Sequence, residues 1–287
     1  MKPTISCVLL GGLGNQLFQI SAVLAYAKER NLKYNFGFWD LDTTDLPFNK
    51  KDISPWGGHS LKNFKSLKEV FANLGCSDKK KFKFEIDRKY LYACNVSANF
   101  LKIDIKYSCR ILGYFFSYKY WHHQRDYILK MLEPSPEIVK YIYDKYYSLF
   151  EQKTVSIHMR LGHLEDNGQV LPIFENFYPR AFKYFNQNEK YLIFTDNISK
   201  FNDIYLENFK KYTNSEFIVI DEDVYIVLFM MAMCDHHILH DSTLSFWGAY
   251  LDNKQPNETK TIYSENTVID KVIPLEYQKK WIKIEYS

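Results

Sequence analysis

Hydrophobic and polar positions along the first forty residues follow the pattern of a strand, a helix and a second strand. Residues 5–10 form a short apolar run that predicts a buried strand, and a glycine-rich turn interrupts it at residues 11–14. Residues 17–30 carry apolar side chains at helical spacing, with small alanines beside them. Residues 32–36 alternate apolar and polar side chains and predict the second strand. The chain therefore opens with a βαβ unit.

The same rhythm returns after residue 110. An apolar run at 111–116 predicts a strand, residues 127–132 predict a helix, and Pro134-Ser-Pro136 marks a break. Beyond it we expect strands at 154–158, 191–194, 217–220 and 237–240, and helices at 177–186 and 224–233. A last helix is expected after residues 241–243 and runs through 251. The pattern predicts an α/β fold of two Rossmann-like domains facing a cleft, over residues 1–135 and 136–287.

Composition narrows the class of protein. The 287 residues are 46% hydrophobic, enough for full cores in two domains. A formal charge of +3 gives no sign of the basic stripe that marks nucleic-acid binding. The five cysteines are scattered, so we expect free thiols in a reducing compartment. No stretch approaches about 18 apolar residues. We therefore expect a cytoplasmic protein without a transmembrane anchor.

The first candidate site is the turn from Gly11 to Gln16. A turn between a strand and a helix presents free backbone N–H groups, which favour an anion. A dinucleotide-binding fingerprint would require a small residue where Leu17 stands. A tight structural turn explains the glycines equally well.

The second candidate is His158-Met-Arg160, at the carboxyl end of a predicted strand, where open α/β sheets bind ligands. The planar guanidinium of Arg160 suits a pyrophosphate, although a surface ion pair is the commoner fate of an arginine.

The third candidate is Asp241-Ser242-Thr243, which precedes an apolar helix. These residue types cap helices, and they also form phosphate cradles at helix N-termini.

Metal sites are not expected. Asp40-Leu-Asp42 and Asp221-Glu-Asp223 are short acidic groups of a kind common in any charged chain. The histidines at 236, 237 and 240 lack a second ligand cluster at zinc spacing.

Six segments occur in the order of one known family. GGLGNQLFQ at 11–19 resembles the N-terminal signature of α-1,2-fucosyltransferases, and GYFFSYKY at 113–120 resembles their GYFQS-x-KYF segment. HMRLG at 158–162 resembles HxRRGD, and FTDN at 194–197 resembles FSDD. STLSFWGAYL at 242–251 resembles STxSWWGAxL, and WIK at 281–283 resembles the W-I/V-x close. The resemblance spans essentially the whole chain.

The resemblance implies an inverting, metal-independent GT-B-type enzyme that needs no cofactor. Its donor would be GDP-β-L-fucose and its acceptor the 2-hydroxyl of a terminal galactose on a glycan or oligosaccharide. The first domain would bind the acceptor and the second the donor. By analogy, Arg160 would hold the pyrophosphate and Asp196 would line the nucleotide pocket. The remaining donor contacts would come from His158, Ser242, Thr243 and Ser245, with Gly12, Gly14 and Asn15 reaching across the cleft.

The chain departs from the family pattern at the arginine motif. Leu161 replaces the second arginine and His163 the acidic residue, and FSDD has lost one carboxylate at Asn197. A fucosyltransferase with a different acceptor or linkage is therefore an alternative. As general base we expect His163, whose ordinary pKa is about 6.5, with Asp166 and Glu165 as rivals. Asn15 can only orient a hydroxyl.

Two other classes of function compete with this interpretation. An NAD-dependent oxidoreductase would use the turn at 11–16, with Asp40 reading the ribose, but its third glycine is missing. A nucleotide-sugar-binding protein without catalytic activity would explain the changes at Leu161 and His163.

Overall fold

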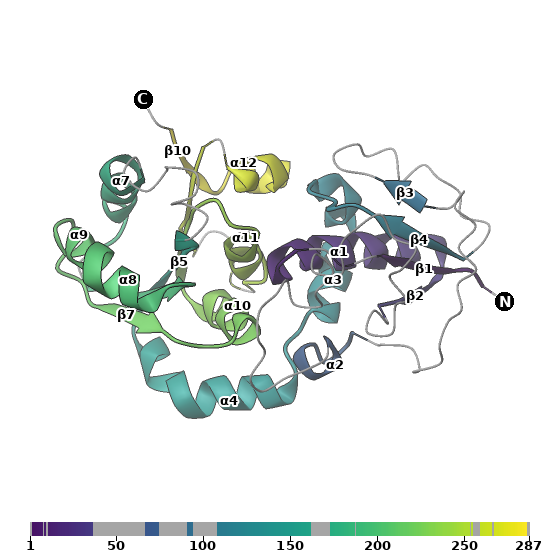
Figure 1. Cartoon of the computed structure of the whole chain (residues 1–287), viewed down its shortest axis with the longest axis horizontal. Coiled ribbons are helices and arrows are strands. Elements are labelled where there is room, and N and C mark those ends of the chain that lie inside the picture. Colours follow the sequence, from purple (N-terminus) through teal and green to yellow (C-terminus); the bar gives the residue numbers. More distant parts are fainter. Residues whose placement is uncertain are drawn as a thin grey trace. The chain divides into compact units, whose positions relative to one another are not determined.

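The chain folds into two compact units, each built on a parallel β-sheet (Figure 1). The computed structural model describes residues 2–7, 9, 11–36, 67–74, 91–93, 108–161, 173–186, 188–252, 254, 259–265 and 267–285. The units comprise Met1–Val139 and Lys140–Ser287. This confirms the predicted α/β fold with parallel sheets.

The N-terminal unit has a four-stranded sheet in the order β2-β1-β4-β3. Every neighbouring pair is parallel. The strands are β1 Thr4–Cys7, β2 Lys33–Asn35, β3 Leu91–Ala93 and β4 Cys109–Leu112. Helix α1, Leu13–Arg30, connects β1 to its parallel neighbour β2, so the predicted βαβ unit is present.

Helix α1 begins four residues earlier than the apolar spacing indicated. Gly12 has an extended backbone and occupies the N-cap position, and Leu13 and Gly14 are already buried. The helix ends at Asn31, whose φ of 54° is the left-handed conformation typical of a helix end. Almost the whole helix is buried, so apolar and small side chains lie on most of its circumference, alanines among them.

The strand predicted at 111–116 is shorter and lies earlier. Strand β4 ends at Leu112, because Gly113 has a φ of 151° and Phe115 a φ of 55°. The short helices η5 Tyr118–Tyr120, η6 His122–Gln124 and α3 Arg125–Met131 follow. The Phe18 ring of α1 contacts Phe116 and Trp121, with ring centroids 5.3 and 5.8 Å away. Two of the six family-like segments therefore pack together.

The C-terminal unit has a six-stranded sheet in the order β10-β9-β8-β5-β6-β7. All neighbours are parallel. The strands are β5 Thr154–Met159, β6 Lys190–Thr195, β7 Phe217–Ile220, β8 His236–Leu239, β9 Thr261–Ser264 and β10 Ile282–Ile284. The first four confirm predicted strands within two residues, whereas β9 and β10 were not predicted.

Helices cover both faces of this sheet (Figure 1). On one face, alternate residues of β5, Val155, Ile157 and Met159, join a core formed with aromatic side chains of the helical segments between β5 and β7. On the other face lie α10 and α11, packed so closely that a Cβ on Gly248 would lie 2.7 Å from the Cβ of Met231. The helices of this unit are η7 Tyr147–Glu151, η8 Ile173–Phe177, α7 Tyr178–Phe182, α8 Ile198–Lys200, η9 Phe201–Tyr205, α9 Leu206–Lys210, α10 Val224–Met233, α11 Thr243–Tyr250, α12 Val268–Val272 and α13 Leu275–Gln278.

The chain passes from one unit to the other inside a helix. The break expected at 134–136 is the start of α4, Pro136–Tyr146, because proline fits the first turn of a helix. The division between the units falls at 139/140, a few residues after the predicted boundary at 135/136.

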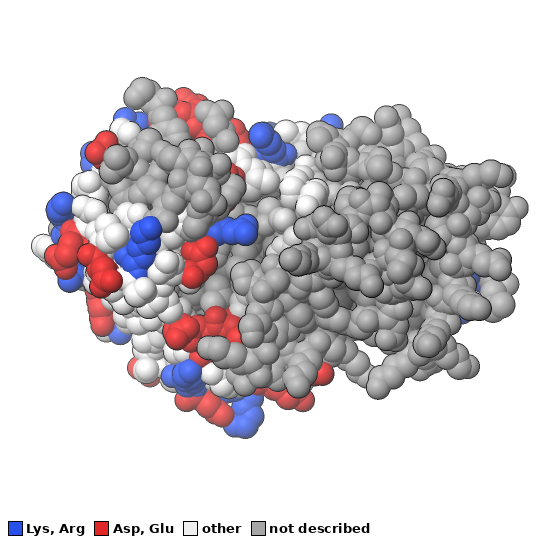
Figure 2. Space-filling model, viewed as in Figure 1, with Lys and Arg blue, Asp and Glu red and all other residues white. Residues whose placement is uncertain are grey.

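Figure 2 shows that, on the face in view, Lys and Arg are interspersed with Asp and Glu over the described surface. None of the described helices is long and apolar enough to cross a membrane.

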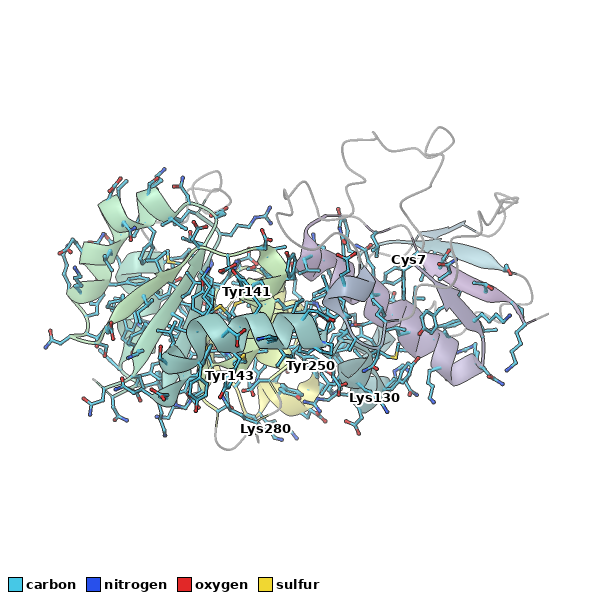
Figure 3. All side chains as sticks on the ribbon, turned by 90° about the horizontal axis from the view of Figure 1, so that it is seen from below. Cys7, Lys130, Tyr141, Tyr143, Tyr250 and Lys280 are labelled. Atoms are coloured by element: carbon cyan, nitrogen blue, oxygen red, sulfur yellow. The ribbon has the colours of Figure 1, made fainter. Side chains whose placement is uncertain are left out.

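The second half of α4 is bound to the turn after β7. Glu222, whose side chain is 6% exposed, accepts hydrogen bonds on Oε1 from Lys145 Nζ at 2.6 Å and from the hydroxyls of Tyr146 and Tyr141 at 2.6 and 2.9 Å. Tyr141 is labelled on α4 in Figure 3. Burial alone raises the pKa of Glu222, but these hydrogen bonds outweigh it and hold the pKa below its ordinary value of 4.5.

The Glu222→Gln variant tests this cluster. Because the folded-state pKa of Glu222 is depressed, its stabilising effect is present above pH 4.5 and is lost as the pH falls through the folded value. At pH 7 we expect the variant to lose about 1–3 kcal/mol of unfolding free energy in urea titrations. The difference from the parent chain should shrink below pH 4.5. Glu207→Gln, at an exposed pair with Lys210, is the control and should change stability little. A difference independent of pH would contradict the ionised role of Glu222.

Candidate functional site

Three of the predicted donor-site segments meet at the carboxyl edge of the C-terminal sheet. Strands β8, β5 and β6 are neighbours and parallel, so their carboxyl ends lie side by side. Arg160 directly follows β5, Asp196 follows β6, and Ser242 lies three residues beyond the end of β8. Arg160 and Asp196 are exposed, and His158 is half-buried within β5. The sheet therefore places a cation, a carboxylate and a helix start at one edge.

The carboxylate of Asp196 contacts the backbone that follows Arg160. The N–H of Leu161 donates to Asp196 Oδ1 at 2.7 Å. The Leu161 side chain is fully buried in the core beneath the sheet. Leu161, the departure from the family pattern, is thus a core residue at this position.

The start of α11 offers backbone N–H groups to an anion. Ser242 has an extended backbone at the N-cap position, and its side chain makes no capping hydrogen bond. Thr243 is half-buried in the first turn. The Ser245 hydroxyl is buried and donates to the carbonyl oxygens of Ser242 at 2.8 Å and His240 at 3.2 Å. Ser245 therefore shapes this turn, and its predicted phosphate contact stays a prediction.

Asp241 caps a helix other than the one expected from the sequence. Its Oδ1 accepts a hydrogen bond from the N–H of Val268, the first residue of α12, at 2.7 Å. Of the three expected capping residues, Ser242 holds the N-cap position of α11, and Asp241 contacts a different helix. The carboxylate instead ties the β8–α11 turn to the segment that follows β9.

The turn at 11–16 lies at the carboxyl end of β1 in the N-terminal unit. Gly11 has a φ of 72°, and its carbonyl oxygen accepts a hydrogen bond from Gln16 Nε2 at 2.8 Å. A Cβ at Gly11 would lie 2.4 Å from Asn15 Nδ2. Gly14 is buried within α1, and Gly12 precedes its first turn. The glycines thus allow a close backbone approach to Asn15.

The predicted bases lie outside the described residues. His163, Glu165 and Asp166 belong to the segment 162–172, so their places relative to Arg160 stay predictions. Within the described part of the chain, no group of three or more His, Cys, Asp or Glu side chains is placed to hold a metal ion. The absence of a metal requirement stays a prediction.

A buried polar network joins the two central strands of the C-terminal sheet, and no motif indicated it. Ser156 Oγ lies 2.8 Å from His237 Nδ1, and His237 Nε2 lies 3.4 Å from Asp252 Oδ2. Burial by itself raises the pKa of Asp252, but hydrogen bonds from His237 and the Lys254 N–H hold it below the usual value. All three side chains are at most 7% exposed, so this serine–histidine–aspartate set is closed to a substrate and holds β5 against β8.

Comparison with known proteins decides the class of enzyme. No family model matches the chain. An alpha-1,2-colitosyltransferase of Escherichia coli is 25% identical over 96% of this chain and 97% of its own length. The O-antigen biosynthesis glycosyltransferase WbnK of Escherichia coli is 27% identical over 86% and 89%. The chain is a glycosyltransferase.

Solved structures give its fold. POFUT1 in complex with GDP matches with a TM-score of 0.55 at 13% identity, over 91% of this chain and 98% of that one. Fucosyltransferase NodZ from Bradyrhizobium matches with a TM-score of 0.52 at 13% identity, over 87% and 92%. An Arabidopsis thaliana FUT1 mutant in complex with GDP matches with a TM-score of 0.52 at 11% identity, over 96% of this chain and 73% of that one. This glycosyltransferase therefore has the GT-B fold, as predicted.

The Gly11→Ala variant tests the left-handed backbone conformation at Gly11 of this glycosyltransferase. A Cβ at a φ of 72° is strained by about 1–2 kcal/mol, and it would also displace Asn15. We expect the variant to unfold at a lower urea concentration than the parent chain. The control is Gly12→Ala, because the φ of −69° at Gly12 suits any residue. A Gly11→Ala midpoint equal to that of the parent chain would contradict the strain expected of an alanine at this φ.

Proposed function

We propose that this glycosyltransferase transfers L-fucose from GDP-β-L-fucose to a sugar hydroxyl, the 2-hydroxyl of a galactoside, with inversion and without a metal. The observation that carries the proposal is the exposed Arg160 at the sheet edge where the start of α11 also lies. The predicted cytoplasmic location and the glycan acceptor are part of the same proposal.

The donor end of this arrangement suits a departing pyrophosphate. As the bond to the sugar breaks, negative charge grows on the phosphate oxygens. Arg160 offers a planar pair of N–H donors to these oxygens. The N–H groups and partial positive charge at the start of α11 attract the same anion. Both groups stabilise the leaving group more strongly as its charge develops.

The acceptor end needs a base that removes the proton of the attacking hydroxyl. His163 is our proposal, with Asp166 and Glu165 as its rivals and Asn15 orienting the hydroxyl. An inverting displacement needs the base on the face of the donor sugar opposite to the pyrophosphate. Undiminished turnover of His163→Ala would remove the histidine from this role and leave Asp166 and Glu165.

The relative named colitosyltransferase favours a second candidate donor. Colitose has the configuration of fucose but lacks its 3-hydroxyl. A donor site that hydrogen-bonds this hydroxyl rejects the deoxy sugar strongly, because polar groups of the site would be left unpaired. The choice between the two sugars therefore depends on the sugar subsite and leaves the proposed pyrophosphate site unchanged.

The first experiment offers both GDP-sugars to the purified protein with a panel of galactosides and EDTA. We expect GDP release and a product heavier by one fucose, with linkage analysis locating it at the 2-hydroxyl. Transfer from GDP-colitose alone would establish the second donor. Donor binding without transfer to any acceptor would favour a binding protein, and no binding of either donor would overturn the nucleotide assignment. Loss of activity in EDTA that Mg²⁺ restores would overturn the metal-free mechanism.

The Arg160→Ala variant tests the pyrophosphate role. We expect kcat/KM for the donor to fall by roughly 10²–10³-fold, because a donor to the developing charge is lost. Arg160→Lys should recover only part of this, since a lysine lacks the planar pair of donors. Lys210→Ala removes an exposed cation on α9 and serves as the control for general charge effects. An effect of Arg160→Ala no larger than that of the control would contradict the assignment.

A further inference from the structure

Arg160 is the exposed residue between two anchored neighbours. Met159 is the last residue of β5 and directly precedes Arg160, and Leu161 directly follows it. Both side chains are fully buried in the same core. Their burial fixes the backbone on either side of Arg160. The arginine side chain is therefore presented from a backbone segment whose path is set by core packing.

The backbone of this segment has a second anchor, which comes from the neighbouring strand. The Leu161 N–H donates to Asp196 Oδ1 at 2.7 Å, and Asp196 directly follows β6. An ionised acceptor makes this hydrogen bond stronger than one to a neutral group. Strands β5 and β6 are paired through Met159 and Thr195, so the bond joins the two segments just beyond the end of their pairing.

We infer that Asp196 is a positioning residue that holds the Arg160–Leu161 backbone so that Arg160 meets the pyrophosphate. This inference rests on the proposed function and changes the role given to Asp196 by the resemblance, which was a contact with the nucleotide. The hydrogen bond from the Leu161 N–H to Oδ1 holds the carboxylate towards the Arg160–Leu161 backbone. Asp196 acts on the donor through Arg160, and Leu161 is the core anchor that makes this possible.

Binding of GDP and of guanosine separates the two roles. Guanosine carries the base and ribose but lacks the pyrophosphate that Arg160 would hold. In calorimetric titrations we expect Asp196→Ala to weaken GDP binding about tenfold, the size of one lost charged hydrogen bond, and to leave guanosine binding unchanged. Asp196→Asn keeps an acceptor oxygen and should bind both ligands within about threefold of the parent chain. Asp221→Ala, an exposed carboxylate after the neighbouring strand β7, is the control and should match the parent.

A double-mutant cycle tests the path through Arg160. In the Arg160→Ala background, Asp196→Ala should cost no further GDP affinity, because the side chain that it positions is absent. Additive losses, or equal losses of GDP and guanosine affinity, would overturn the inference and leave the proposed function intact. If Asp196→Ala fails to fold, Asp196→Asn decides, since a direct hydrogen bond from guanine or ribose to the carboxylate would cost it affinity for guanosine as well. Failure of the parent chain to bind GDP would overturn the proposed function and this inference together.

Discussion

The pairing of β5 with β6 and β8 is the constraint on which the candidate donor site depends. Each of these strands contributes only four to six residues, and their side chains alternate between two differently built faces. A slip of one residue in β5 would turn Val155 and Ile157 away from the aromatic core and bury Arg160 in its place. The register that buries the core is therefore the register that exposes the arginine.

Two sets of polar contacts stabilise that register, one within the sheet and one beyond the carboxyl ends of its strands. Within the sheet, His237 of β8 lies opposite Ser156 of β5, and their hydrogen bond joins the strands on the face opposite to the aromatic core. Beyond the sheet, Asp196 and Asp241 each accept a backbone N–H from the segment following a neighbouring strand. Buried or charge-assisted hydrogen bonds of this kind are directional, so they determine where the loops leave the sheet as well as adding stability.

The sequence carries enough information for the strongly apolar elements and too little for the connections. Strand β7 and helix α10 coincide with the predictions at both ends, because each is a continuous apolar run that directly follows a charged residue. Strand β10 alternates too few apolar residues to be recognised, and α4 was hidden by prolines that mark its beginning. The strand predicted at 111–116 was wrong at its end because a φ of 55° at Phe115, unusual for a bulky residue, leaves no signal in hydrophobicity.

The candidate site shows the same division between side-chain chemistry and backbone geometry. Arg160 and Ser242 were recognisable because an arginine after a strand and a serine before a helix have direct physical reasons to bind phosphate. The partners of Asp196 and Asp241 were not recognisable, because each acts on a backbone N–H tens of residues away in the chain. Leu161 shows what the motif comparison misses. Compared with the motif, it is a lost arginine, whereas in the fold it is a fully buried side chain. A charge at that position would have to be buried in an apolar core, which is costly. The replacement at Leu161 is therefore consistent with a working donor site, and the balance between catalysis and simple binding rests on the residues that follow it.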